Sequence, residues 1–169
     1  RRGDAPALIC AAAYRLFSDK GYLATSIEDI AAEAGVARPT VFTAVGPKST
    51  ILRHVVDQAL AGDDAPVPIA ERPWWRAPID EPDAVRAIQL HARNMCLINQ
   101  RAAPLLRALE TAASVDAEAR DVWDRFQRQR RDGLTEVAVA LRRKTDRLRY
   151  DEATITDTLW MLTPDAYLR

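Results

Sequence analysis

The sequence lacks any excess of charge. It carries 24 basic and 24 acidic side chains, so its formal net charge at pH 7 is zero. The chain as a whole is therefore not drawn to polyanions, and charge can favour such a partner only locally. It also lacks any apolar run near the roughly 18 residues of a membrane span. Two cysteines, Cys10 and Cys96, stand far apart in apolar helical patterns, and free thiols of this kind favour a cytoplasmic protein.

Motifs for metal binding and catalysis are missing as well. There is no CxxC pair and no Cys/His cluster, so we expect no metal site. The only histidines are His54 and His91, and no Ser/His/Asp set, pair of carboxylates on one face or Gly-rich phosphate loop accompanies them. We therefore predict that the protein is not an enzyme and needs no cofactor.

Strand signals are absent too, whereas helical periodicity runs through the chain, so the sequence predicts an all-α fold. In the first part, Pro6 can open a helix that Lys20 and Gly21 end. Ser26 with Asp29 three residues later forms an Asp version of the capping box for a second helix. The expected helices there cover residues 6–20, 26–34, 38–45 and 47–60.

The second part begins after a proline-rich connection at residues 62–82, which holds five of the ten prolines. We expect a short extended or turn segment there, fixed by Trp74 or Trp75. Next we expect a central buried helix over 83–103, broken by Pro104. Further helices are expected over 104–113, 116–143 and 151–163.

Residues 26–45 combine two helices with a Gly-Val turn, the arrangement in which the second helix of a helix-turn-helix enters the major groove of DNA. Gly35 permits the left-handed backbone that the turn needs. From Ala34 to Val56 there are three basic residues and no Asp or Glu. A stretch without Asp or Glu, in a protein whose net charge is zero, indicates a polyanionic partner. The phosphate backbone of DNA is the simplest such partner.

The stretch "TSIEDIAAEAGVARPTVFTAVGPKSTIL" resembles the N-terminal domain of TetR-family transcriptional regulators, and the resemblance covers residues 6–60. It implies a three-helix, homeodomain-like helix-turn-helix domain at 1–47. A helical bundle for ligand binding and dimerisation would follow at 48–169, with 48–60 as connecting helix and 62–82 as proline-rich connection.

The resemblance also implies roles for individual residues. Ser26 and Lys48 would bind phosphates, and Arg38, Pro39, Thr40 and Thr43 would face the groove. Phe42 stands where the family usually has Tyr, which removes a phenolic phosphate contact but leaves a ring that can pack on a thymine methyl group.

Two uses of the second part remain open: a plain dimerisation scaffold or a ligand pocket. Polar residues of the central helix, such as His91 and Asn94, are costly in an apolar bundle unless they find partners. For a pocket, we predict that a small apolar or aromatic effector is lined by His91, Met95, Trp123 and Phe126. For a homodimer, we predict an interface at Ile155, Leu159 and Leu162, because an apolar stripe near a chain end must be covered.

The function predicted on these grounds is a sequence-specific, DNA-binding transcriptional regulator. It would most simply be a homodimeric repressor released from a palindromic operator by its effector. The alternative is a helical protein-binding module whose helix-turn-helix is structural only.

Overall fold

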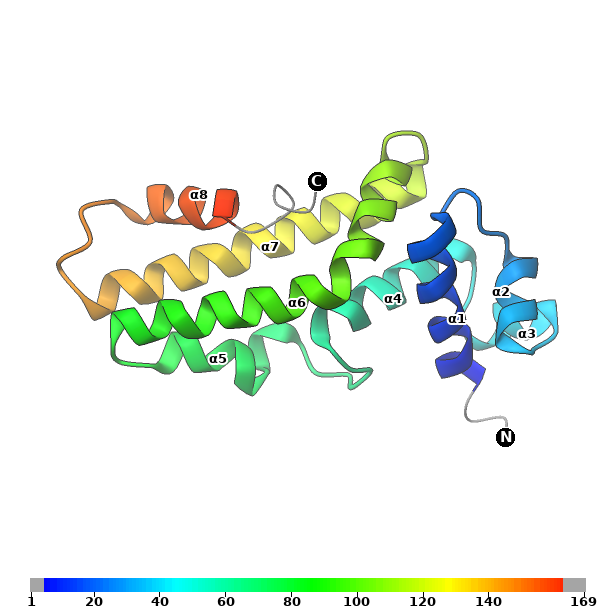
Figure 1. Ribbon diagram of the computed structural model, residues 1–169, viewed down its shortest axis with the longest axis horizontal. Coiled ribbons are helices and arrows are strands. Elements are labelled where there is room, and N and C mark those ends of the chain that lie inside the picture. The colour runs from blue at the N-terminus through cyan, green and yellow to red at the C-terminus, as the bar shows by residue number, and fades with distance from the viewer. Residues whose placement is uncertain (1–4, 163–169) are drawn as a thin grey trace. The chain divides into compact units, whose positions relative to one another are not determined.

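The computed structural model describes residues 5–162, which are helical with no strand (Figure 1). The elements, in chain order, are α1 (Ala5–Lys20), α2 (Ile27–Ala34), α3 (Arg38–Ala44), α4 (Lys48–Ala61), the 3-10 helix η2 (Ile69–Glu71), α5 (Pro73–Asp80), α6 (Ala84–Ala113), α7 (Ala117–Lys144) and α8 (Glu152–Leu162). The all-α prediction is confirmed. No helix of this part of the chain is long and apolar enough to cross a membrane.

The residues pack into two units. The first comprises the chain up to Asp63 together with Arg101–Arg125, and the second comprises Asp64–Gln100 and the residues from Phe126 onward. Because α6 and α7 contribute to both units, the predicted boundary between residues 47 and 48 is not a boundary between packing units. It concerns the functions of the two parts, DNA binding and ligand binding. It stays a prediction.

In the first unit, α1 packs against α2, α3 and α4, and α2 packs against α3 (Figure 1). Its fully buried large side chains are Ile9, Phe17, Tyr22, Ile30, Val41, Ile51, Leu52, Val55, Leu105 and Leu109. Burying a side chain of this size stabilises a fold by about 1.5–3 kcal/mol. The Phe17 and Tyr22 rings meet at 5.4 Å between centroids. The helices of the helix-turn-helix are thus fixed by one apolar core.

The ends of α2 follow the predicted local chemistry. The Ser26 hydroxyl accepts a hydrogen bond from the Asp29 amide, and the Asp29 carboxylate accepts one from the Ser26 amide. Gly35 ends the helix with φ +67°, in the left-handed region that favours glycine, and its N–H returns to Ala31 and Ala32. The capping box and the turn are confirmed.

In the second unit, α5, α6, α7 and α8 share one core (Figure 1). Its buried members are Trp75, Ala87, Leu134, Val137, Ala138, Leu141, Ile155 and Leu159. Trp75 is fixed by a 3.0 Å hydrogen bond from its Nε1 to Glu136 of α7. Gly133 lies directly beneath the same ring, because a Cβ there would come within 2.8 Å of Trp75 Cη2.

The proline-rich connection contains helices that the sequence analysis did not predict, namely η2 and α5. Pro73 occupies the first turn of α5, where its missing N–H costs nothing. Pro78 lies inside the helix and leaves the carbonyl of Trp74, four residues earlier, without its helical donor. The side-chain amide of Asn94 donates to that carbonyl, so α5 keeps its hydrogen bonds despite Pro78.

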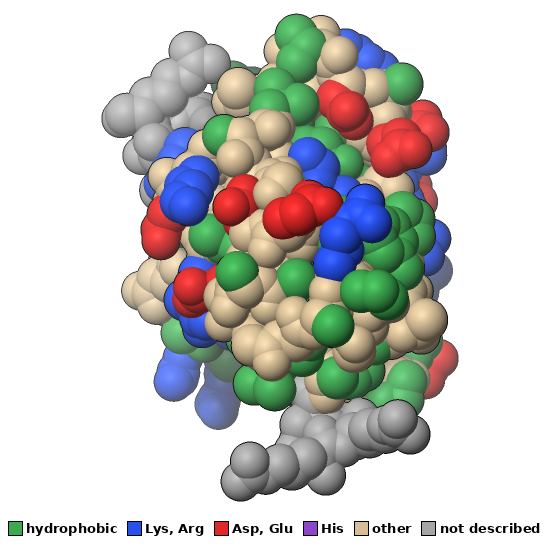
Figure 2. Space-filling view, turned by 90° about the vertical axis from the view of Figure 1, so that its right-hand side faces the viewer, with side chains coloured by type: hydrophobic (Ala, Val, Ile, Leu, Met, Phe, Trp, Pro, Cys, Tyr) green, Lys and Arg blue, Asp and Glu red, His purple; other side chains and the backbone are tan. Residues whose placement is uncertain are grey.

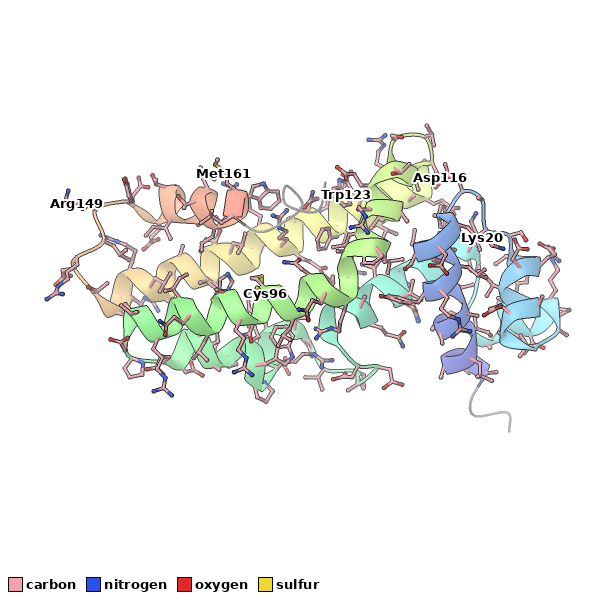
Figure 3. The ribbon with its side chains drawn as sticks, in the orientation of Figure 1. Lys20, Cys96, Asp116, Trp123, Arg149 and Met161 are labelled. Carbon is pink, nitrogen blue, oxygen red and sulfur yellow. The ribbon has the colours of Figure 1, made fainter. Side chains whose placement is uncertain are left out.

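The prediction that Pro104 breaks a helix is wrong, since α6 continues through it. In the turn before Pro104, the carbonyl of Arg101 accepts a 2.6 Å hydrogen bond from the Tyr14 hydroxyl of α1. The prediction that residues 83–103 are buried is also wrong for much of that stretch. Val85 is 63% exposed, and Cys96, which Figure 3 labels, is exposed as well.

Candidate nucleic-acid interface

The outer face of α3 is the surface that a helix-turn-helix would present to DNA. Val41 is the buried residue of this helix, and it fixes which face points inward. Arg38, Pro39, Phe42 and Thr43 are exposed, and Thr40 is half-buried. The structure therefore brings five of the predicted DNA-contacting residues together on one short helix.

Arg38 opens α3 and is already engaged within the protein. Its Nε donates a hydrogen bond to Oε1 of Glu28 in the first turn of α2, so the two form an ion pair. Its Cζ lies 5.1 Å from the centroid of the Phe42 ring, one turn further along α3. A guanidinium over an aromatic face is attracted by the ring quadrupole. Arg38 is thus oriented before any ligand arrives.

The small polar side chains of the face bond within the protein too. The Ser26 hydroxyl donates to the Asp29 carboxylate in the capping box. The Thr43 hydroxyl donates to the carbonyls of Pro39 and Thr40, both at 3.2 Å. Both residues are exposed, so their hydroxyl oxygens stay within reach of a ligand. Their assignment to DNA contacts stays a prediction.

Lys48, the predicted phosphate ligand, joins the start of α4 to the segment between α1 and α2. Its Nζ donates to the carbonyls of Tyr22 and Thr25, both at 3.0 Å, and lies 4.1 Å from the Tyr22 ring centroid. Burial lowers the pKa of this amine, while Asp116 and Glu118 act in the opposite direction. An ammonium group has three N–H donors. Two are committed here, which leaves one for a phosphate.

We expect Lys48→Ala to destabilise the first unit by about 1–3 kcal/mol, because two carbonyls lose their charged donor. Arg53→Ala is the matched control, since it removes the same charge from an exposed position of the same helix. Chemical denaturation of both variants measures the difference. If the third donor also binds a phosphate, Lys48→Ala will weaken binding to all DNA alike and lower the salt slope by about one unit. Equal stability of the two variants would contradict the internal role.

Three acidic residues of the first unit are paired with arginines. Glu28 pairs with Arg38, Glu33 with Arg15 at 2.9 Å, and Asp57 with Arg125 at 2.6 Å. Figure 2 shows the side on which α2 and α3 lie, where basic and acidic side chains adjoin one another among apolar ones. Pairing reduces the repulsion that these carboxylates would exert on a phosphate backbone.

The predicted pocket residues fall in both units. His91, Met95 and Phe126 belong to the second, whereas Trp123, labelled in Figure 3, belongs to the first. His91 is 4% exposed, and its ring meets the Trp75 ring at 6.5 Å between centroids. Burial lowers the pKa of His91 to about 4, so the imidazole is neutral at neutral pH. Met95 packs against the core that contains Trp75.

Two of the three predicted dimer residues are covered by their own chain. Ile155 and Leu159 are 8% and 9% exposed and belong to the core of the second unit. Exposure therefore gives no reason for these two residues to contact a second copy, and their place in a dimer interface stays a prediction. Leu162 is 59% exposed and Met161, which Figure 3 labels, is 71% exposed. An interface at Leu162 stays a prediction.

Sequence reasoning missed Glu28 and Arg101. Arg101 donates from Nε to the carbonyl of Ala59 and from Nη2 to that of Leu60, both at 3.3 Å. These carbonyls end α4 and have no helical donors of their own. The Glu28 contact could have been expected from the sequence, because Glu28 lies in the first turn of the second predicted helix and Arg38 in the first turn of the third.

Comparison with known proteins agrees with this geometry. Residues 9–57 match the family described as bacterial regulatory proteins, tetR family. Two solved structures of HlyIIR mutant proteins superpose with a TM-score of 0.71 at 14% identity. They cover 96% of this chain and 84% and 85% of theirs. A Clostridium perfringens protein described as a fatty acid metabolism regulator superposes with a TM-score of 0.63 at 14% identity, over 90% of this chain and 79% of its own. None of the curated proteins matches the chain.

Residues 9–57 therefore form a domain of the kind found in the tetR family of bacterial regulatory proteins. Proteins of this class are DNA-binding transcriptional regulators and not enzymes. The solved structures share the fold over most of the chain, and at their low identity they support the fold alone.

Proposed function

We propose that the protein is a homodimeric repressor that places α3 of each copy in successive major grooves of a palindromic operator. The observation that carries the proposal is the exposed face of α3, where Arg38, Pro39, Phe42 and Thr43 stand together on a rigid core. The paired acids around it support the same use. A regulator of this kind meets its operator on the chromosome, so we place it in the bacterial cytoplasm.

Selection of DNA from a random pool tests this proposal. We expect recovery of a two-fold symmetric site and binding that weakens steeply as salt rises, because counterions leave the phosphates on binding. A symmetric site would also report two copies per operator. Absent or salt-insensitive binding would favour the alternative, a helical module that binds a protein partner.

Within that proposal, Arg38 reads a base. We expect Arg38→Ala to cost about 1–3 kcal/mol on the selected operator and to relax the preference at one position of each half-site. Titration of operator and scrambled DNA at several salt concentrations measures both effects. If the variant loses the same factor on both DNAs, Arg38 is a phosphate ligand, and Thr40 and Thr43 would carry the reading.

We place the effector in the second unit, beside His91. The imidazole is buried, neutral and in edge contact with Trp75. A neutral imidazole can donate one hydrogen bond and accept another, which suits a small ligand with one polar group. Met95 in the neighbouring core supports an apolar or aromatic compound. Such a compound would release DNA only by its different affinity for two conformations.

Dimerisation is the remaining part of the proposal. Met161 and Leu162 leave an exposed apolar end on α8, and apolar residues at such a place support contact with a second copy. Sedimentation at micromolar concentration tests it, and a monomer there would exclude this interface.

A further inference from the structure

Glu28 is an acidic residue at the surface that faces DNA in the proposed function. Its side chain is 63% exposed, and that of Arg38 is 58% exposed. A carboxylate there repels the phosphate backbone, so it lowers affinity for every DNA sequence. Exposed ion pairs contribute little to stability. An acid in the first turn of α2 is favoured by the helix dipole, but that preference does not require its carboxylate to meet Arg38 of α3.

The ion pair uses a particular nitrogen of Arg38. Glu28 accepts from Nε, and the Phe42 ring lies under the guanidinium at 5.1 Å from Cζ. No described residue accepts a hydrogen bond from Nη1 or Nη2. The guanidinium is thus held at one edge by Glu28 and on one face by Phe42. Its two terminal nitrogens keep their N–H groups as a planar fork, the geometry that binds a guanine edge with two hydrogen bonds.

We propose that Glu28 is a positioning residue for sequence reading, which fixes Arg38 through Nε so that Nη1 and Nη2 address one base pair. This inference rests on the proposed DNA-binding function. Glu28 lowers affinity for all DNA and raises the difference between right and wrong sequences, which is how a repulsive group produces specificity. Fixing the side chain beforehand also reduces the entropy that Arg38 loses on binding.

Three variants of the full chain separate this role from a simple surface charge. Glu28→Gln removes the charge and keeps an oxygen that can accept from Nε. Glu28→Ala removes both. Glu33→Ala is the matched control, because it removes the same charge from the same helix, where the partner is Arg15 rather than a residue of α3. Circular dichroism confirms that each variant folds.

Affinity is measured on the selected operator, on the operator with single base pairs replaced, and on scrambled DNA. We expect Glu28→Ala to lower discrimination at one base pair of each half-site by about tenfold, the lower part of what a bidentate contact supplies. Scrambled DNA should bind this variant as well as before or better. Glu28→Gln and Glu33→Ala should keep their discrimination.

Equal changes on all DNAs for Glu28→Ala and Glu33→Ala would overturn the inference, because the carboxylate would then act only as a charge. The wild-type protein is measured first. If it shows no preference among sequences, the proposed function fails, and this inference fails with it. If it is selective and Glu28→Ala keeps every preference, only the positioning role fails.

Discussion

Gly133→Ala should destabilise the protein by about 1–2 kcal/mol, the middle of the range for an overpacked core. In an ordinary helix the same change stabilises by about 1 kcal/mol, since alanine has the higher helix propensity. Here the new Cβ would lie 2.8 Å from Cη2 and 2.9 Å from Cζ2 of Trp75. That ring cannot turn aside freely, because Nε1 is bonded to Glu136 and the ring also contacts Trp74 and His91.

The control for this prediction is the effect of Gly133→Ala on stability in a protein that lacks the Trp75 ring. Trp75→Phe shortens the ring and removes the atoms that the Cβ would meet, although it is destabilising by itself. In that background, Gly133→Ala should be neutral or stabilising, because only the helix propensity remains. Chemical denaturation of the four proteins completes the double-mutant cycle. The same destabilisation in both backgrounds would show that the contact with Trp75 is not its cause.

Arg101→Met should destabilise the first unit by about 2 kcal/mol, because two hydrogen bonds from a charged donor are lost. Methionine keeps most of the aliphatic volume but offers no donor to the carbonyls of Ala59 and Leu60. The last turn of α4 should then open more often. Faster hydrogen exchange at residues 58–61 is the local readout of that opening.

Arg107→Met is the matched control on the same helix, where the arginine is exposed. It should change neither stability nor exchange in α4. Arg101→Lys should recover part of the loss, since one ammonium can reach one carbonyl but lacks the planar fork. If Arg101→Met and Arg107→Met have the same stability, the guanidinium does not hold the end of α4.

The helices of the first 60 residues could be predicted to within a few residues because their ends depend on neighbours in sequence. Ser26 with Asp29 forms a cap over three residues, and Gly35 acts through its own backbone. The exposure of Arg38 and Thr43 follows from Val41 facing inward on a short helix. These parts of the site need only helical periodicity.

The rest depended on contacts distant in sequence. Pro104 was expected to end a helix, yet α6 continues through it, and in the preceding turn the Arg101 carbonyl accepts from the Tyr14 hydroxyl, 87 residues away. Lys48 was expected to face phosphate because it opens a helix. Its two bonds to carbonyls 23 and 26 residues earlier arise only once α1, α2 and α4 have packed together. The residues next to Lys48 in the sequence do not indicate which distant groups it will contact.

Pro78 and Asn94 have a consequence for how the second unit finds its register. Along most of a helix the carbonyls are already occupied, so a neighbouring helix can slide past without losing a main-chain bond. Pro78 leaves one carbonyl open, at Trp74, and Asn94 is the side chain that fills it. A shift of α5 by one turn against α6 would break this hydrogen bond, at a cost of about 0.5–1.5 kcal/mol. Pro78, which should weaken α5, thereby favours the register in which Asn94 meets the Trp74 carbonyl.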